Sequence, residues 1–400
     1  MRILFVHDLF GAFGGAEANV LATASELKER GHTVGVLYER TSNQGEVAWS
    51  STFEHRFLLE RGPASAYRLA AWESFEPDVV YLHKMSDLEL LERLLASGIP
   101  IIRMVHDHDL YCMRSYKYHY LTRRICERAL SPFCVIPCGA SIARNHDGAF
   151  PLKWVSYTAK VRELALNRKL YRLIVATQFM KEELLRNQFA GDKVEIHAPV
   201  PRGGDASCSS SFSDRNVIVY AGQLIRGKGV DVLLEALAQI RTSFSCFIFG
   251  DGSQRDECEK LSRKLGLADR VFFRGFVSSD EFAAFYRDAT VAVVSSVWPE
   301  PFGAVGLEAM RFGLPVVAFD AGGIREWLID GHNGFLVPWM DRPAFAARVE
   351  ELLRDKALAR QMGERGRQWV TEHHDFSEYI SGLENLFEQA LGNPVLAVIA

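Results

Sequence analysis

A pattern of short apolar runs that alternate with amphipathic helical stretches constrains the fold of this chain more than any other feature. The first forty residues read as strand RILFVHD, a glycine-rich turn, helix AEANVLATASELKERG and strand HTVGVLYE. Apolar, β-branched runs at 77–83, 100–106 and 171–177 continue the pattern. Strands that are separated by helices pair in parallel, so the pattern predicts a doubly wound α/β domain.

The same alternation starts again after a stretch rich in Gly, Ser, Asp and Pro at 197–216, which is typical of a linker. Strand-like runs follow at 216–222, 244–250, 270–276 and 290–296. The 400 residues therefore divide into an N-terminal domain, 1–200, and a C-terminal domain, 201–375. We expect two Rossmann-like α/β sheets whose carboxyl edges face a shared cleft. The last stretch, 376–400, begins with an amphipathic helical pattern.

Composition excludes some function classes. A formal net charge of −4 provides no overall attraction to nucleic acid. The opening MRILFVHDLF has only four successive apolar residues, and the terminal PVLAVIA is too short to cross a bilayer. We therefore expect a cytoplasmic protein whose seven cysteines are thiols or metal ligands.

The first glycine-rich turn could bind an anion. Gly14 and Gly15 lie at a predicted helix start, where bare N–H groups and the helix dipole attract phosphate. A tight turn that requires glycine explains the same residues. The spacing from Gly11 is not G-x-G-x-x-G, and Glu39 is a weak substitute for a ribose-binding acid, which argues against a nucleotide-dependent oxidoreductase.

Two loops of the second domain carry charges where strands are expected to end. Arg226 and Lys228 follow the strand at 216–222 and could neutralise a phosphate, although a solvated Lys-Gly turn is the alternative. The segment PEPFGAVGLEAM, 299–310, places Glu300 before a helix start and Glu308 two turns later. Carboxylates accept hydrogen bonds from sugar hydroxyls, but a helix cap and a solvated face would also explain the two glutamates.

Residues 299–337 closely resemble the signature of the family 4 glycosyltransferases, which have the GT-B fold. Glu300 and Glu308 match the E-x7-E motif of that family. FGGAE at 13–17, His106, AGQLIRGKGVDVLLEAL at 221–237, FGDGS at 249–253 and VFFRGFV at 271–277 occur in the family's order. In this fold the last helix crosses back to the first domain, so we expect the same of 376–400.

The resemblance implies retaining, metal-independent transfer of a sugar from a nucleotide-diphosphate donor of the UDP or GDP type. It assigns Glu308 to the ribose hydroxyls, Glu300 to the donor sugar, Lys228 to the diphosphate, and His106 to the side of the sugar. The remaining donor contacts that it implies come from Gly14, Gly15, Arg226, Phe276, Phe302, Gly303, Ala304 and Val305.

One position departs from the family pattern. Family members usually have arginine where this chain has Gln223, so the diphosphate loses a cation unless Arg226 replaces it. A catalytically silent nucleotide-sugar-binding protein therefore stays as an alternative. The triplet Asp107-His108-Asp109 has the form D-x-D of metal-dependent transferases, but the two-domain pattern argues against that architecture.

The segment 111–172 is basic and contains a group of cysteines. Its twelve Lys and Arg against three acids give a net charge of +9, with tyrosines and Trp154 interleaved. This composition suits an anionic membrane surface or a phosphate-bearing acceptor, or simply a solvated basic face. The four thiols could close a structural zinc site, or be unrelated buried cysteines; they are Cys112, Cys126, Cys134 and Cys138.

Together these features predict a glycosyltransferase that acts on a saccharide or lipid-linked acceptor in the synthesis of a cell-surface polysaccharide or glycolipid. No nucleic-acid partner and no catalytic cofactor are expected. The basic segment predicts peripheral association with the inner face of the membrane.

Overall fold

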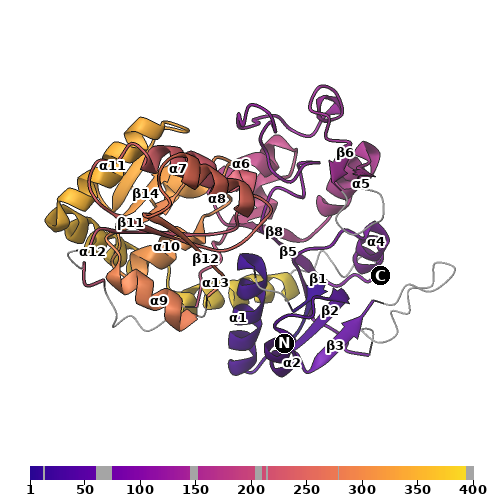
Figure 1. Ribbon diagram of the computed structural model, residues 1–400. Coiled ribbons are helices and arrows are strands. Elements are labelled where there is room, and N and C mark those ends of the chain that lie inside the picture. The colour runs from indigo at the N-terminus through magenta and orange to yellow at the C-terminus, as the bar shows by residue number, and fades with distance from the viewer. Residues whose placement is uncertain are drawn as a thin grey trace. The chain divides into compact units, whose positions relative to one another are not determined.

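The computed structural model describes residues 1–11, 14–59, 74–144, 152–202, 210–212, 215–277 and 279–392, and the chain divides into two compact units (Figure 1). Unit 1 consists of Met1–Ser115, Glu127–Arg202 and the segment from Phe376. Unit 2 consists of Tyr116–Cys126 and Gly203–Asp375. Among the helices of the described residues, none is long and apolar enough to cross a membrane.

The main division lies two residues from the boundary expected at 200, and the segment Tyr116–Cys126 departs from the expectation. This segment belongs to unit 2 although it lies within the predicted first domain. The reason is local: the Arg123 guanidinium donates to both carboxylate oxygens of Asp231, and Arg226 Nε donates to the Tyr120 carbonyl at 3.2 Å.

The sheet of unit 1 has seven strands, and every pairing between them is parallel. In sheet order they are β3 (His55–Leu58), β2 (Thr33–Thr41), β1 (Arg2–Phe10), β4 (Val79–Leu82), β5 (Ile101–Val105), β8 (Arg172–Val175) and β9 (Val194–Ile196). The helices are α1 (Gly15–Glu29), α2 (Glu46–Thr52), α4 (Leu88–Ala96), α5 (Tyr157–Asn167), α6 (Gln178–Arg186) and α13 (Phe376–Leu391). A two-stranded antiparallel ribbon joins β6 (Ile142–Arg144) to β7 (Leu152–Trp154).

Both faces of this sheet are buried. Successive side chains of a strand point to opposite faces, so alternate residues pack on opposite sides. Ile3 and Phe5 pack with α1, α2 and α13, whereas Leu4 and Val6 pack with α4 and α5. Helix α13, yellow in Figure 1, lies beside α1, and Arg30 joins the two helices through a 2.8 Å bond to Glu384. The C-terminal helix therefore belongs to the core of unit 1.

Unit 2 is a parallel sheet of six strands. In sheet order they are β12 (Val271–Gly275), β11 (Ser245–Phe249), β10 (Val217–Ala221), β13 (Val291–Val294), β14 (Val316–Phe319) and β15 (Gly334–Val337). Its α-helices are α7 (Val230–Leu237), α8 (Arg255–Lys264), α9 (Ser279–Asp288), α10 (Ala304–Arg311), α11 (Arg342–Arg354) and α12 (Lys356–His373). Short 3₁₀ turns form at η1 (Pro132–Cys134) and η2 (Gly191–Lys193) in unit 1, and at η3 (Arg226–Lys228) and η4 (Gly323–Glu326) in unit 2.

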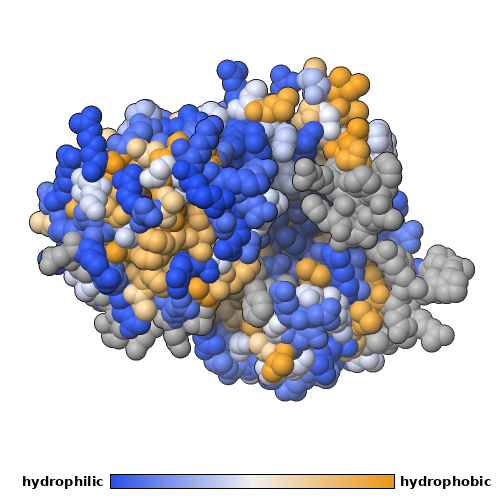
Figure 2. All heavy atoms as spheres, in the orientation of Figure 1, coloured by the Kyte–Doolittle hydropathy of each residue, from blue (hydrophilic) through white to orange (hydrophobic). Residues whose placement is uncertain are grey.

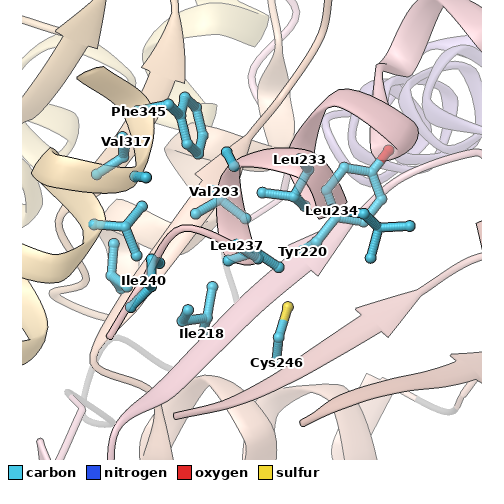
Figure 3. Close-up of a cluster of buried hydrophobic side chains, with 14 of the residues drawn as sticks. Ile218, Tyr220, Leu233, Leu234, Leu237, Ile240, Cys246, Val293, Val317 and Phe345 are labelled. Carbon is cyan, nitrogen blue, oxygen red and sulfur yellow. The ribbon is translucent and has the colours of Figure 1, made fainter. Parts of the chain in front are cut away.

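A continuous apolar layer fixes α7 and α11 on one face of the second sheet. Leu233 and Leu237 of α7 and Phe345 of α11 gather over Ile218 and Val293 of the strands (Figure 3). All five side chains are almost fully buried. The layer packs α7 and α11 against the strands β10 and β13, whose following loops contain Lys228 and Glu300.

The strand order reverses between β1 and β4 in unit 1 and between β10 and β13 in unit 2. Open α/β sheets bind ligands at such switch points, outside the carboxyl ends of the strands. His83 and His106 come directly after β4 and β5, while the loops with Lys228 and Glu300 follow β10 and β13.

Candidate functional site

The loop that holds Lys228 is tied to the neighbouring loop by close backbone contacts. Gly229 has a positive φ of 66°, and a Cβ there would lie 2.2 Å from the Ser295 carbonyl oxygen. Ser295 Oγ donates to the Lys228 carbonyl at 2.9 Å, and the Val297 N–H donates to Gly227 at 2.9 Å. A side chain at Gly229 would separate the loops, so glycine is required for their approach.

Lys228 and Glu300 form a nearly buried ion pair at this switch point. Lys228 Nζ lies 2.6 Å from Glu300 Oε1 and 5.2 Å from the centre of the Trp298 ring, and Ser296 Oγ donates to the same carboxylate oxygen. Glu300 is only 3% exposed. Burial raises the pKa of Glu300, but Lys228 and Ser296 outweigh it and hold that pKa below its usual value. The Glu300 carboxyl is therefore ionised, and the two side chains orient each other.

Helix α10 starts beside this pair with an uncapped turn. Gly303 is its N-cap residue at a φ of +83°, and it provides no side-chain hydrogen bond to the first N–H groups of the helix. Trp327 packs against this turn, and its Nε1 donates to the Phe302 carbonyl at 2.6 Å. A Cβ at Gly306 would lie 2.1 Å from the Trp327 ring. The free N–H groups of Ala304 and Val305 suit an anion.

Glu308 lies farther along α10 in less polar surroundings. Its side chain is partly buried, and burial raises its pKa to about 7, which the charge of Arg311 only partly opposes. The E-x7-E motif thus contains two carboxyls of different character. Lys228 keeps Glu300 ionised, whereas Glu308, with a pKa of about 7, changes its charge near neutral pH.

Three further residues follow the carboxyl ends of strands in unit 2: Gln223, Arg226 and Phe276. The Arg226 guanidinium lies 5.0 Å from the centre of the Tyr120 ring, so this cation already has a partner within unit 2. Gln223 is exposed, and its carbonyl accepts a 3.3 Å bond from the Tyr220 hydroxyl. Phe276, directly after β12, is 78% exposed and free to stack on a flat ligand.

In unit 1 the predicted glycines lie at the start of α1. Gly14 is its N-cap residue, with an extended backbone, and the space where a Cβ of Gly15 would lie is open to 4 Å. Glu17 lies on the first turn, and its Oε1 lies 3.8 Å from His7 Nε2. An acid beside this helix start makes it less favourable for an anion than the start of α10.

His106 is paired with His83, a residue that was not among the predicted site residues. Its Nε2 lies 2.8 Å from His83 Nδ1. The D-x-D triplet follows His106: Asp107 lies 3.3 Å from Lys84 Nζ, and burial raises the pKa of Asp109 to about 6. The sequence shows only that His83 follows a predicted strand. The signal becomes specific once β4 is known to pair with β5, the strand that His106 follows.

The structural zinc site stays a prediction. Cys112, Cys126, Cys134 and Cys138 are free thiols, and within the described ranges no group of three or more His, Cys, Asp or Glu side chains could hold a metal ion. The Cys126 N–H bonds back to Lys117 within the segment of unit 2, whereas the N–H groups of Cys134 and Cys138 bond to Ser131 and Phe133.

Comparison with known proteins matches nearly the whole chain. The family described as Glycosyltransferase Family 4 matches residues 13–200, and the one described as Glycosyl transferases group 1 matches residues 208–369. A D-inositol 3-phosphate glycosyltransferase of Streptomyces avermitilis is 32% identical over 215 residues, which are 48% of this chain and 46% of that protein.

A second curated relative is the lipopolysaccharide core biosynthesis glycosyltransferase LpsE of Rhizobium meliloti, 34% identical over 156 residues, 39% of this chain and 45% of that protein. The chain thus spans about half the length of these curated relatives. The crystal structure of Anabaena HepE in complex with UDP and glucose superposes with a TM-score of 0.74 at 20% identity, covering 97% of this chain and 100% of that one. This likeness confirms the expected GT-B fold.

Proposed function

Because the chain belongs to the family 4 glycosyltransferases, we propose that it is a retaining enzyme that moves a sugar from a nucleotide-diphosphate donor to a saccharide or lipid-linked acceptor. The observation that carries the proposal is the Lys228–Glu300 pair beside the uncapped start of α10. A cation, an anchored carboxylate and free N–H groups lie together at one switch point. These groups match the charges that develop when a sugar-phosphate bond breaks.

In the proposed reaction the bond between the anomeric carbon and the diphosphate oxygen breaks, and its electron pair leaves with the diphosphate. Lys228 and the N–H groups of Ala304 and Val305 stabilise this negative charge. The acceptor hydroxyl then bonds to the anomeric carbon on the same face, and its proton passes to the departing phosphate oxygen. Lysine and a helix start supply the positive charge, so no catalytic metal is invoked.

The two glutamates take separate roles in this proposal. Glu300 stays ionised beside Lys228 and accepts hydrogen bonds from hydroxyls of the donor sugar. Glu308, farther along α10, accepts hydrogen bonds from the ribose hydroxyls of the nucleotide. Phe276 provides an exposed ring for the base.

The donor is proposed to be of the UDP or GDP type. HepE, which shares the fold, was crystallised with UDP and glucose, and this supports a nucleotide-sugar donor. The names of LpsE and of the D-inositol 3-phosphate enzyme support acceptors that are carbohydrates or related polyols, consistent with a role in cell-surface polysaccharide or glycolipid synthesis.

The first test is a thermal-shift screen of the purified protein against UDP-, GDP-, ADP- and dTDP-sugars, with the free nucleotides and NAD alongside. A ligand that binds the folded state raises the melting temperature, by an amount that grows with its concentration relative to Kd. We expect a shift with one nucleotide family, and a smaller shift in the Lys228→Met variant. A shift with NAD alone would contradict the proposal.

One observation favours a catalytically silent binding protein as the second candidate. The chain has Gln223 where family members usually have arginine, and Arg226 is already engaged by Tyr120. With both cations absent from the diphosphate, binding could persist without turnover. Release of nucleoside diphosphate from a bound donor, measured over time, separates the two candidates.

We also propose that unit 1 associates with an anionic membrane surface. Large apolar side chains project from the segment between β5 and α5, where Ile136 is 78% and Trp154 73% exposed. Trp154 pairs across the β6–β7 ribbon with Ile142, Lys153 beside it is exposed, and Arg128 lies 5.0 Å from the centre of the Phe133 ring. Figure 2 shows apolar surface gathered over the region of β6 and α5.

Aromatic and aliphatic side chains next to cations are typical of interfacial binding. The wild-type protein should sediment with vesicles that contain phosphatidylglycerol, and Trp154→Ser should reduce the fraction of protein that sediments. Val47→Ser is the matched control, because Val47 is 87% exposed on α2, outside this segment. Equal binding of the three proteins, or no binding at all, would contradict this part of the proposal.

A further inference from the structure

Three histidines lie side by side at the switch point of unit 1. His7 is part of β1, His83 follows β4 and His106 follows β5, and these strands are neighbours in the sheet. His7 is fully buried, His83 is 1% exposed and His106 is partly buried. The ring centres of His7 and His83 are 6.4 Å apart, and those of His83 and His106 are 5.1 Å apart.

The last two histidines are joined by a hydrogen bond. His83 Nδ1 and His106 Nε2 are 2.8 Å apart, and the two rings are within 19° of parallel. Burial lowers the pKa of His83 well below its usual value and that of His106 to about 3. Both imidazoles are therefore neutral at physiological pH, and each has one N–H and one bare nitrogen.

The surroundings of His83 indicate which ring donates. Its Nε2 is buried, with no hydrogen-bond partner among the residues that the structure describes. The ring is packed by Phe5, whose centre is 5.7 Å away, and by Tyr81 at 4.3 Å. If His106 donated from Nε2, His83 Nδ1 would have to accept, and the proton of His83 would lie on Nε2. That buried N–H would have no acceptor among the described residues. If His83 donates, only a lone pair is left unpaired, and orphaned donors are the rarer case in folded proteins.

We propose that His83 is a positioning residue: it donates from Nδ1 to His106 and thereby keeps the proton of His106 on Nδ1. His106 then offers an N–H, and not a lone pair, to a ligand oxygen at the carboxyl edge of this sheet. It acts as a neutral hydrogen-bond donor and not as a base. Only the part that concerns the ligand rests on the proposed function; the tautomer is a property of unit 1 itself.

The tautomer is measured directly by ¹H–¹⁵N correlation spectra of protein labelled with ¹⁵N-histidine, with the signals of His106 assigned by comparison with His106→Gln. We expect Nδ1 of His106 to be protonated in the wild-type protein. In His83→Phe, which keeps a packed ring but has no nitrogen, the proton should redistribute between Nδ1 and Nε2. A proton on Nε2 of His106 in the wild-type protein would overturn the proposal.

Turnover tests the consequence for a ligand. His83→Phe should lower kcat for sugar transfer about tenfold, the value of one well-placed hydrogen bond, while the affinity for the free nucleotide is unchanged. His83→Asn, whose side-chain amide can donate from near the Nδ1 position, should restore most of the lost activity. Equal loss in both variants at unchanged melting temperature would refute the positioning role. If the wild-type protein transfers no sugar, the proposed function fails, and the spectra still decide the tautomer.

Discussion

Removing Lys228 should destabilise unit 2 far more than removing the charge of Glu300. Glu300 is 3% exposed, so Lys228→Met leaves a buried carboxylate whose remaining partners are neutral. Loss of one partner of a buried pair costs about 3 kcal/mol or more. The Lys228 side chain is 22% exposed, so in Glu300→Gln the ammonium can turn toward water, and we expect a loss of about 1 kcal/mol.

The assay is urea unfolding of the three variants, Lys228→Met, Glu300→Gln and the double variant, followed through the transition of unit 2 at pH 7 and at pH 4. The double variant should be more stable than Lys228→Met alone, because it contains no buried charge. The pKa of Glu300 is held below its usual value, so its contribution is present near neutral pH and is lost as the pH falls through the folded pKa. The cost of Lys228→Met should therefore shrink toward pH 4. Losses below about 0.5 kcal/mol in both single variants would mean that the pair contributes no more than a screened surface ion pair, contrary to the prediction.

Three further predictions concern α10. Burial raises the pKa of Glu308 from 4.5 to about 7, so the folded state loses stability as the pH rises through that range. Thermal melts should show Glu308→Gln to be more stable than the wild type at pH 8, by at most about 3 kcal/mol. The two proteins should have equal stability near pH 4.5. Titration calorimetry should show nucleotide affinity rising from pH 6 to pH 8 in the wild type but not in Glu308→Gln, because ribose hydroxyls donate to the ionised carboxylate. Trp327→Ala should cost about 3 to 5 kcal/mol in urea unfolding, since the ring is fully buried against Gly303 and Gly306; an unchanged midpoint would mean that the start of α10 needs no such support.

The order of strands and helices could be predicted because burial on both faces of a parallel sheet requires continuous apolar runs. RILFVHD, NVIVYAG and TVAVVSS all contain strands of the structure. The switch-point loops could be predicted for the same reason, since they are the segments that follow those strands.

Contacts between distant residues could not be predicted in this way. Lys228 and Glu300 are 72 positions apart, and their pairing depends on how the loops after β10 and β13 pack on each other. The family resemblance assigned Lys228 to the diphosphate and Glu300 to the sugar, but the sequence did not indicate that each side chain orients the other. His83 was missed because a single histidine after a strand is no signal until its neighbour in the sheet is known.

The cysteines show the limit of composition as evidence. Four thiols within 27 residues are compatible with a zinc site, but a metal requires them to converge on one point. Within the described residues the four cysteines are free thiols, and no group of three or more His, Cys, Asp or Glu side chains could hold a metal ion. Spacing alone does not say whether thiols converge, so the zinc site stays a prediction.

We propose that the switch point of unit 2 breaks a sugar-phosphate bond without a catalytic metal. The most direct measurement is the release of nucleoside diphosphate from the donor that stabilises the protein, with EDTA present and with saccharide acceptors supplied. We predict steady release by the wild-type protein and a loss of about 100-fold or more in Lys228→Met, the scale on which a single stabilising donor acts. No release from a donor that the folded protein binds, or equal rates in both proteins, would contradict the proposed function.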